Sequence, residues 1–487
     1  MSFLVRLFFF CSTAADADRV IMLRSRHGLI LAVLGLLIVA TIMVNSASLS
    51  LSGGQPTTTG GIFLGKHTWF AVGAFIALVL GALVPADRLG GTGSTWWSTP
   101  VTWVAAAIFV SLALVHVPGI GREVNGARRW ISLGPVGLQP SEIAKWGVPI
   151  IVAWYAVRQR ARIGSFKWGF AVPLGAVSVL CGLIALEDLG TAVLIEVVSV
   201  ALLLAAGARW TYVAALAPVG LLAFVALIVT SPYRVNRIAA FLDPYKDPQG
   251  IGYHIIQSME AISGGGLAGR GLGNSELKFG YLPEATTDFI YSIVAEELGL
   301  TGSVVVIALY ILLIGCGVAI VTATARIATN RSGTSTATPA HAGTPDPANL
   351  ATGGFTETPL LSNFSQLLGF GIVLTVGLQA LINVCVVTGL APTKGIALPL
   401  MSRGGTGWIL TCLSLGFLIA MERAADHRRR ALGVPVPGEG EGAPFDERVT
   451  VNPAAHSTGY MASRGVAYAG GGTSGMVTSG SDAAGMT

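Results

Sequence analysis

The feature that most limits the fold of this chain is a series of apolar segments, each close to twenty residues long. A helix of that length spans the hydrocarbon core of a bilayer. Charged residues make up 11% of the chain, whereas soluble domains contain about 25%. The sequence therefore predicts an all-α polytopic membrane protein.

Ten transmembrane helices are expected, in residues 28–47, 68–86, 101–117, 142–158, 168–186, 189–207, 210–231, 288–322, 364–390 and 404–421. Basic segments precede the first helix and follow the fourth and the tenth, which places all three on one side of the membrane. An excess of Lys and Arg in short loops marks the cytoplasmic side. We therefore expect a multi-pass protein of the cytoplasmic membrane with both termini in the cytoplasm.

The segments outside this membrane domain of residues 28–421 differ in composition. Residues 1–27 are expected to be an N-terminal cytoplasmic extension. Residues 323–363 and 422–487 are rich in small and turn-forming residues, which predicts a flexible cytoplasmic loop and a disordered cytoplasmic tail. Residues 232–287 instead mix aromatic side chains with charges, so we expect a large, ordered outer loop between the seventh and eighth helices.

The cysteines and the net charge argue against a protein held by disulfides or metal ions and against a nucleic-acid-binding protein. The five cysteines form no CxxC pair, and four lie in or beside apolar runs, so they are expected to be core residues. The net charge of +5 is modest, so nucleic acid is not an expected partner. Most Lys and Arg should mark topology or contact a substrate.

Many cations fall on the outer side, where the orientation of the chain does not require them. They are Arg122, Arg128, Arg129, Arg234, Arg237, Lys246, Arg270, Lys278, Lys394 and Arg403. A group of cations at the outer leaflet suits an anionic ligand. The alternative for any one of them is an anchor at a helix end, with its charge in the interface.

Five blocks of sequence, in order, resemble one family. They are "NGARRWISLGPVGLQPSEIAKW" (125–146), "DLGTA" (188–192), the loop 233–290, "AEELG" (295–299) and "GLAPTKGIALPLMSRGG" (389–405). Over about residues 28–421 the chain resembles the SEDS family (shape, elongation, division and sporulation). "GLGNS", "YLPEA" and "PTKG" favour its division-type, FtsW-like branch, whereas "GYHIIQS" is closer to the elongation-type, RodA-like branch.

The sequence departs from the family pattern in three places near these blocks. Glu187 replaces the Pro that usually precedes "DLGT", and "SRGGTG" replaces "SYGGSS". Thr286 replaces the His of the usual "HTDF". A supporting role of that His is therefore not carried over to this chain.

The resemblance implies a peptidoglycan glycosyltransferase of cell division. Its substrate would be lipid II, and it would join a sugar 4-hydroxyl to an anomeric carbon while undecaprenyl diphosphate leaves. Its partners would be a class B penicillin-binding protein, which is a transpeptidase, other division proteins and membrane lipid. The alternatives are an elongation polymerase, a lipid II flippase with a polar path through the bundle, and a scaffold of a division complex.

Asp288 is the expected catalytic base, because it closes the outer loop and opens the eighth helix. Its alternative role is a first-turn acid that meets the helix dipole, worth about 0.5–1 kcal/mol. Glu284 is expected to be a solvated loop charge, and the alternatives are a second acid or a metal ligand. Glu296 and Glu297 follow on the same helix, which predicts a depth about 12 Å below Asp288 at 1.5 Å per residue. At that depth they should face the bundle interior.

Cations are needed for the leaving diphosphate. The expected substrate-binding residues are Arg128, Arg129, Lys145, Arg234, Arg237, Lys278 and Lys394, and the expected supporting residues are Glu142, Glu284, Glu296, Glu297 and Ser402. Lys145 and Glu142 lie three residues apart, so they are alternatively a structural pair. No cluster has metal-ligand spacing, and a divalent cation such as Mg²⁺ or Mn²⁺ between Asp288 and the diphosphate stays an open alternative.

Overall fold

A computed structural model describes most of the membrane domain. The described residues are 24–49, 65–85, 99–124, 127–133, 136–277, 286–333, 363–393, 395–403 and 405–431. All of them belong to the first of two compact units, Met1–Gly438. The predicted site residues Lys278, Glu284 and Lys394 lie outside the described residues.

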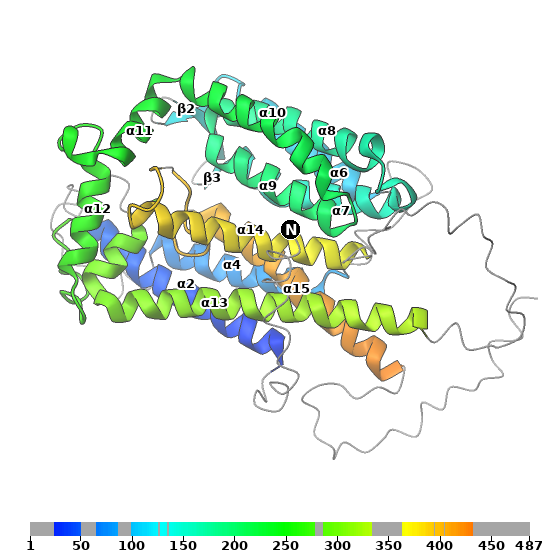
Figure 1. The fold of residues 1–487 in the computed structure, drawn as a ribbon. Coiled ribbons are helices and arrows are strands. Elements are labelled where there is room, and N and C mark those ends of the chain that lie inside the picture. Colours follow the sequence, from blue (N-terminus) through cyan, green and yellow to red (C-terminus); the bar gives the residue numbers. More distant parts are fainter. Residues whose placement is uncertain are drawn as a thin grey trace, which may run out of the picture. The chain divides into compact units, whose positions relative to one another are not determined.

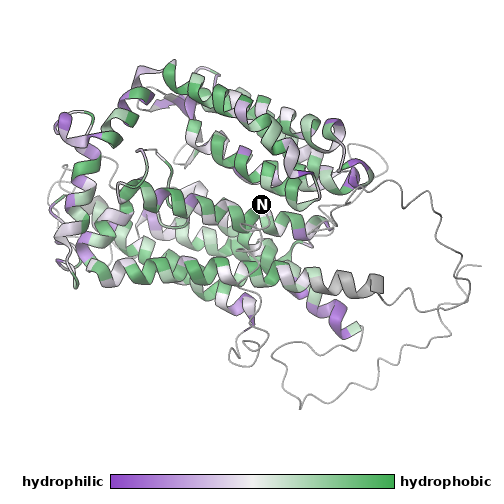
Figure 2. Cartoon of the chain, in the orientation of Figure 1, coloured by the Kyte–Doolittle hydropathy of each residue, from purple (hydrophilic) through white to green (hydrophobic). Residues whose placement is uncertain are grey.

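Each of the ten segments predicted to be helical is a helix (Figure 1). These helices are α2 (Ser25–Leu49), α4 (Lys66–Leu83), α6 (Pro100–Leu114), α7 (Pro140–Arg158), α8 (Val172–Glu187), α9 (Leu189–Ala205), α10 (Trp210–Val229), α13 (Ile290–Gly333), α14 (Phe364–Val387) and α15 (Gly405–Ala431). Within the described ranges, seven helical stretches are long and apolar enough to cross a membrane. Apolar residues cover most of their length in Figure 2. The chain is therefore a multi-pass helical membrane protein.

The large loop after α10 is ordered where it is described. It contains α11 (Pro232–Leu242), the short 3-10 helix η6 (Pro244–Lys246) and α12 (Tyr253–Gly264). Pro lies at the first position of α11, and Val235, Ile238, Ala239 and Leu242 follow at the i, i+3, i+4, i+7 spacing of an amphipathic helix, which explains why a helix forms there.

A small sheet between α6 and α7 was not predicted. Strands β1 (Gly121–Val124), β2 (Ala127–Leu133) and β3 (Val136–Leu138) pair antiparallel in the order β1-β2-β3. The sequence carries the hairpin dipeptide Asn-Gly between the first two strands. The short 3-10 helix η4 (Arg160–Arg162) and the π-helix η5 (Phe166–Ala171) connect α7 to α8.

Two helices are longer than predicted. α13 continues to Gly333, although a flexible loop was expected from residue 323, and α15 continues to Ala431, although a tail was expected from residue 422. The added residues include Ala and Arg, which favour helices, and the first Gly of the α13 extension is its last residue. In α15, the added turn pairs Asp426 with Arg26 at 3.3 Å.

α13 consists of two helices that meet at Gly299, where the backbone has φ 68° and ψ −161°. Only glycine adopts this conformation readily. Main-chain hydrogen bonds from a distant loop satisfy the broken helix: Gly271 N donates to Glu297 O at 3.0 Å, and Leu300 N donates to Gly266 O at 2.9 Å. The loop and the break therefore stabilise each other.

The first of these helices, residues 290–298, runs in the same direction as α14. At its start, the carbonyl of Asp288 accepts a hydrogen bond from Asn383 of α14. One turn later, Ser292 contacts Ser258, which in turn donates to the carbonyl of Val387 at the end of α14. Both chains therefore advance toward the same end of the bundle.

The second helix of α13 runs in the opposite direction. Gly377 of α14 packs against Ile314, whereas Gln366, three turns earlier in α14, donates to the carbonyl of Thr324. The chain thus reverses at Gly299. Residues 290–298 run toward the end of the bundle, and the long helix that follows Gly299 runs back across it.

This reversal corrects the predicted depth of two acids. Glu296 and Glu297 do not lie deeper than Asp288 but nearer the end of the bundle where α2 ends, because Glu297 accepts hydrogen bonds from Ser46 in the last turn of α2. The prediction assumed one continuous helix, and the break at Gly299 makes that assumption wrong.

Candidate active site

A cavity of about 1110 Å³ lies between the sheet, α7, α9, α10, α11 and the segment that connects α14 to α15. Its charged lining residues are Lys66, Arg122, Arg129, Glu142, Lys145, Glu187, Asp188, Arg234, Arg237, Asp288 and Arg403. Seven predicted site residues therefore meet in one cavity: Arg129, Glu142, Lys145, Arg234, Arg237, Asp288 and Ser402. Arg128, Glu296 and Glu297 do not line it.

Asp288 lies in the turn before α13, and its carboxylate faces the segment after α14. A Cβ placed on Gly395 would lie 2.8 Å from Oδ2 of Asp288. The absence of a side chain at position 395 is therefore what admits the carboxylate at this place. The neighbouring Thr286 is buried, and its carbonyl accepts a hydrogen bond from Arg403 N at 2.8 Å.

Residues 392–393 and 395–403, which we call the strap, form part of the cavity wall. Side chains of neighbouring helices hold the main chain of the strap. Gln379 donates to Ala397 O at 2.6 Å, and the hydroxyl of Tyr310 donates to Pro399 O. Leu400 adopts φ 63°, which is strained for a residue with a side chain. This strain persists because the contacts around it fix the strap.

Ser402, a predicted supporting residue, braces the strap internally. Its hydroxyl accepts a hydrogen bond from Leu398 N at 2.6 Å, and its carbonyl accepts one from the indole of Trp408 at 2.8 Å. The side chain is buried. Its contacts are therefore those of a residue that shapes the cavity wall.

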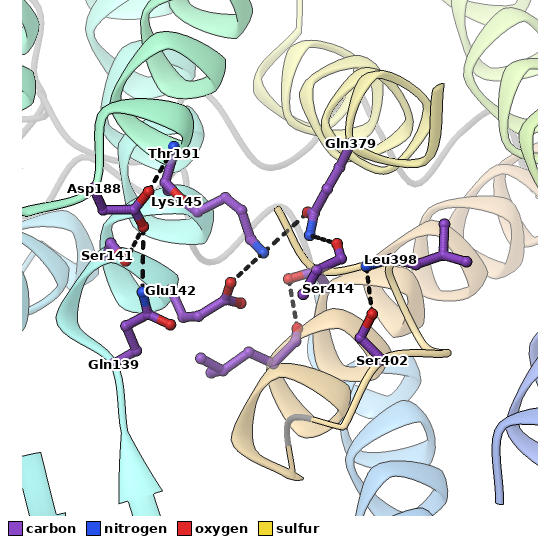
Figure 3. A network of polar contacts seen from close by, with 12 residues as sticks. Gln139, Ser141, Glu142, Lys145, Asp188, Thr191, Gln379, Leu398, Ser402 and Ser414 are labelled. Atoms are coloured by element: carbon purple, nitrogen blue, oxygen red, sulfur yellow. Dashed lines mark hydrogen bonds and ion pairs between the residues drawn. The ribbon is translucent and has the colours of Figure 1, made fainter. Parts of the chain in front are cut away.

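Lys145 and Glu142 form the predicted pair, with 2.7 Å between Nζ and Oε1 (Figure 3). Nζ also donates to Oε1 of Gln379 at 3.0 Å, and the Lys145 side chain is only 3% exposed. A buried charge that keeps its partner is tolerated, whereas an uncompensated one is costly. Lys145 is therefore neutralised within the protein and joins α7 to α14.

Asp188 was missed as a site residue, although it stands in the quoted motif "DLGTA". It is the N-cap of α9: Oδ1 accepts from Thr191 N at 3.1 Å. Oδ2 accepts from Ser141 at 3.0 Å and Gln139 at 3.2 Å (Figure 3). An Asp between two apolar helices is a recognisable N-cap signal. Here it fastens the start of α7 to the start of α9.

The guanidinium groups of Arg234 and Arg237 donate hydrogen bonds to main-chain carbonyls of different segments. Arg234 donates to the carbonyls of Leu227 and Ala185, each at 2.7 Å. Arg237 donates to Thr393 O at 2.9 Å and lies over the ring of Tyr233. These two side chains line the cavity but also tie α10, α8 and the strap together.

Arg128 and Arg129 are neighbours on β2 with different surroundings. The Arg128 side chain is 59% exposed, pairs with Glu123 at 3.3 Å and does not line the cavity, and its role in substrate binding stays a prediction. Arg129 lines the cavity, and its buried Nε has no hydrogen-bond partner within the described residues. Arg129 is the extra residue where the register between β1 and β2 shifts, because Arg128 pairs with Glu123 and Trp130 pairs with Arg122. A bulge of this kind re-aims a side chain, which accounts for the difference.

Glu296 and Glu297 anchor segments outside the cavity. Glu296 accepts from Ser275 Oγ and from Glu276 N, and lies 3.5 Å from the guanidinium of Arg270. Both acids are almost fully buried. A hydrogen bond to Glu276 raises the pKa of Arg270 above its ordinary value, so this cation stays charged.

Sequence reasoning left out several residues of the site. Lys66, Arg122, Glu187, Asp188, Gln379 and Arg403 line the cavity but were not among the chosen site residues. Arg122 and Arg403 carried a signal, since both belong to the outer cations. Gln379 carried no such signal. The role of a Gln in an apolar helix becomes clear only when its hydrogen-bond partner is known, which here is the carbonyl of Ala397.

The fold and site define a class: a multi-pass helical membrane protein whose polar cavity combines carboxylates with cations. The sequence profile of the FtsW/RodA/SpoVE cell cycle proteins matches residues 27–332 and 352–427. The chain therefore belongs to this family, which confirms the resemblance seen in the motifs.

Individual relatives agree. The chain is 35% identical to the probable peptidoglycan glycosyltransferase FtsW of Legionella pneumophila over 407 residues, 83% of this chain and 92% of that protein. It is also 35% identical to the stage V sporulation protein E of Bacillus subtilis over 328 residues, 67% of this chain and 80% of that protein. A solved chain from a study of structural coordination of polymerization and crosslinking by a peptidoglycan synthase complex superposes with a TM-score of 0.54. The solved chain is 25% identical to this protein, and the match covers 80% of this protein and 97% of the solved chain.

Proposed function

We propose that this protein is a peptidoglycan glycosyltransferase that polymerises lipid II during cell division. Its relatives are named for this activity. The observation that carries the proposal is the meeting of Asp288 and Arg129 in one cavity, since the reaction needs a base at one end and a cation at the other.

In the proposed reaction, Asp288 accepts the proton of the attacking sugar 4-hydroxyl. The hydroxyl oxygen forms a bond to the anomeric carbon of a second lipid II molecule as the bond from that carbon to the diphosphate oxygen breaks. Undecaprenyl diphosphate leaves with the electron pair. One positioned base suffices for such a single displacement, and the anomeric centre inverts.

Arg129 is the proposed contact for the diphosphate, because its guanidinium has an unused donor directed at no protein group within the described residues. The planar guanidinium binds two oxygens at once. No group of three or more His, Cys, Asp and Glu in the described ranges has the arrangement of a metal site. If the reaction uses a divalent cation, Asp288 would be the residue that holds it, and the cation would supply positive charge for the leaving diphosphate.

The cavity is proposed to face the extracytoplasmic side, and both termini the cytoplasm. The start of α2 and the end of α15 pair through Arg26 and Asp426, so the two basic ends lie together. Basic segments favour the cytoplasmic side. The neighbour from a peptidoglycan synthase complex also supports a transpeptidase partner, for which we propose a class B penicillin-binding protein.

The test is polymerisation of labelled lipid II by the purified protein with its transpeptidase partner in detergent, where no second leaflet exists. Wild-type protein should form glycan chains, and Asp288→Asn should lose a factor of about 10²–10⁴ in rate. Glu260→Gln, which alters an exposed acid of α12, is the matched control and should keep the wild-type rate. Normal chains from Asp288→Asn would refute the base, and their absence with wild-type protein would favour a flippase.

A further inference from the structure

One amide side chain joins the two chain segments that meet at Asp288. Asn383 of α14 is 1% exposed. Its Nδ2 donates to the carbonyl of Asp288 at 2.9 Å and to the carbonyl of Ile396 at 2.7 Å. These acceptors are far from each other in sequence, one in the turn before α13 and the other in the strap.

The chemistry of this contact requires a primary amide. Two carbonyls need two N–H donors from a single point, and the NH₂ group of Asn supplies both. Leu has the same size but no donor, and an ionised Asp accepts only, so it would repel both carbonyls. The Oδ1 atom of Asn383 is buried without a hydrogen-bond partner within the described residues. A buried polar atom without a partner is costly and needs an explanation. Here the two hydrogen bonds donated by Nδ2 supply it.

Asp288 is thereby held on two sides. Asn383 fixes its main chain, and Gly395 of the strap lies against its carboxylate. Gln379, one turn before Asn383 on the same face of α14, holds the strap at Ala397 and contacts Lys145. Side chains of α14 therefore contact the strap, the turn of Asp288 and α7, and fix their positions relative to one another.

We propose that Asn383 is a positioning residue that sets the place of the Asp288 carboxylate against the strap. This inference rests on the proposed function, in which Asp288 is the base. Without the amide, the turn and the strap lose their common attachment, and the carboxylate moves relative to the sugar hydroxyl. A displacement near 1 Å lowers rates by about 100-fold.

The experiment compares Asn383→Leu with Gln366→Leu in the lipid II assay. Gln366 is the matched control, because it is also a buried amide of α14 that donates to a carbonyl of another helix, Thr324 O at 3.1 Å, and does not line the cavity. Melting temperature and the folded fraction are measured for both. A merely structural role predicts that both variants lose stability and keep kcat per folded molecule.

We expect Asn383→Leu to lower kcat by about 10–100-fold with KM changed less than about twofold. Gln366→Leu should keep kcat. Asn383→Ser, which retains one donor, should fall between Asn383→Leu and wild type, and it serves as the test variant should Asn383→Leu not fold. Wild-type kcat for either Asn383 variant would overturn the inference while leaving Asp288 as the base. Activity of Asp288→Asn would instead overturn the proposed function.

Discussion

Replacing Gly395 by Ala tests whether the place of the Asp288 carboxylate governs the rate. The added Cβ would lie 2.8 Å from Oδ2, closer than the 3.4 Å at which ordinary contact begins. The carboxylate must therefore retreat by roughly 0.6 Å, since a contact this short is repulsive. The strap itself is braced by Gln379 and Asn383, so the carboxylate is the group that yields.

The size of the effect follows from that displacement. A misplacement of 1 Å costs about 100-fold in rate, so a shift of roughly half that distance predicts a loss of about tenfold, or about 1.4 kcal/mol in the activation free energy. The folded state should be little affected, because the clash involves a side-chain oxygen at the cavity surface and no main-chain atom.

The assay is the rate of chain formation from labelled lipid II at saturating substrate, together with the melting temperature in the same detergent. Gly164→Ala is the control: it lies in the turn after α7, and a Cβ there meets nothing within 4 Å. It should keep both the rate and the melting temperature. A wild-type rate for Gly395→Ala, with Asp288→Asn inactive, would refute the link between carboxylate position and rate.

Two further predictions concern stability. Lys145→Met leaves Glu142, whose side chain is 16% exposed, without its cation and should lower the free energy of unfolding by about 1–3 kcal/mol, because a partly solvated carboxylate costs less than a fully buried one. A double variant with Glu142→Gln should recover part of the loss, and equal melting temperatures for Lys145→Met and wild type would contradict the argument. Gly299→Ala forces an L residue to φ 68° and places its Cβ 2.4 Å from Gly269 N, so a cost of at least about 1–3 kcal/mol is expected. Thermal denaturation measures it, and a neutral effect would show that the reversal does not depend on glycine.

The helices were predictable because the length and polarity of a segment are local properties. Each apolar run became a helix, and the Glu142–Lys145 pair followed from a spacing of three residues. The meeting of Asp288 with Arg129 and Lys145 came from motif resemblance, and the cavity bears out that these residues lie together. Their roles in the reaction stay predictions.

The reversal at Gly299 was not predictable from the local pattern. Residues on both sides of it favour helix, and the partner that satisfies the broken helix is a loop about thirty residues earlier in the chain. The consequence was an inverted depth for Glu296 and Glu297. Likewise, the contact by which Asp188 joins α9 to α7 was not predictable, because its partner Ser141 is 47 residues away in sequence.

Because of the reversal, the length of the helix at residues 290–298 fixes a distance. The turn of Asp288 lies at one end of this helix and Gly299 at the other. Its length therefore sets how far Asp288 lies from the end of α2. Each inserted or deleted residue would shift that distance by about 1.5 Å and rotate the carboxylate by about 100° around the helix axis. The number of residues in this helix therefore helps to set where the carboxylate of Asp288, in the turn before it, lies.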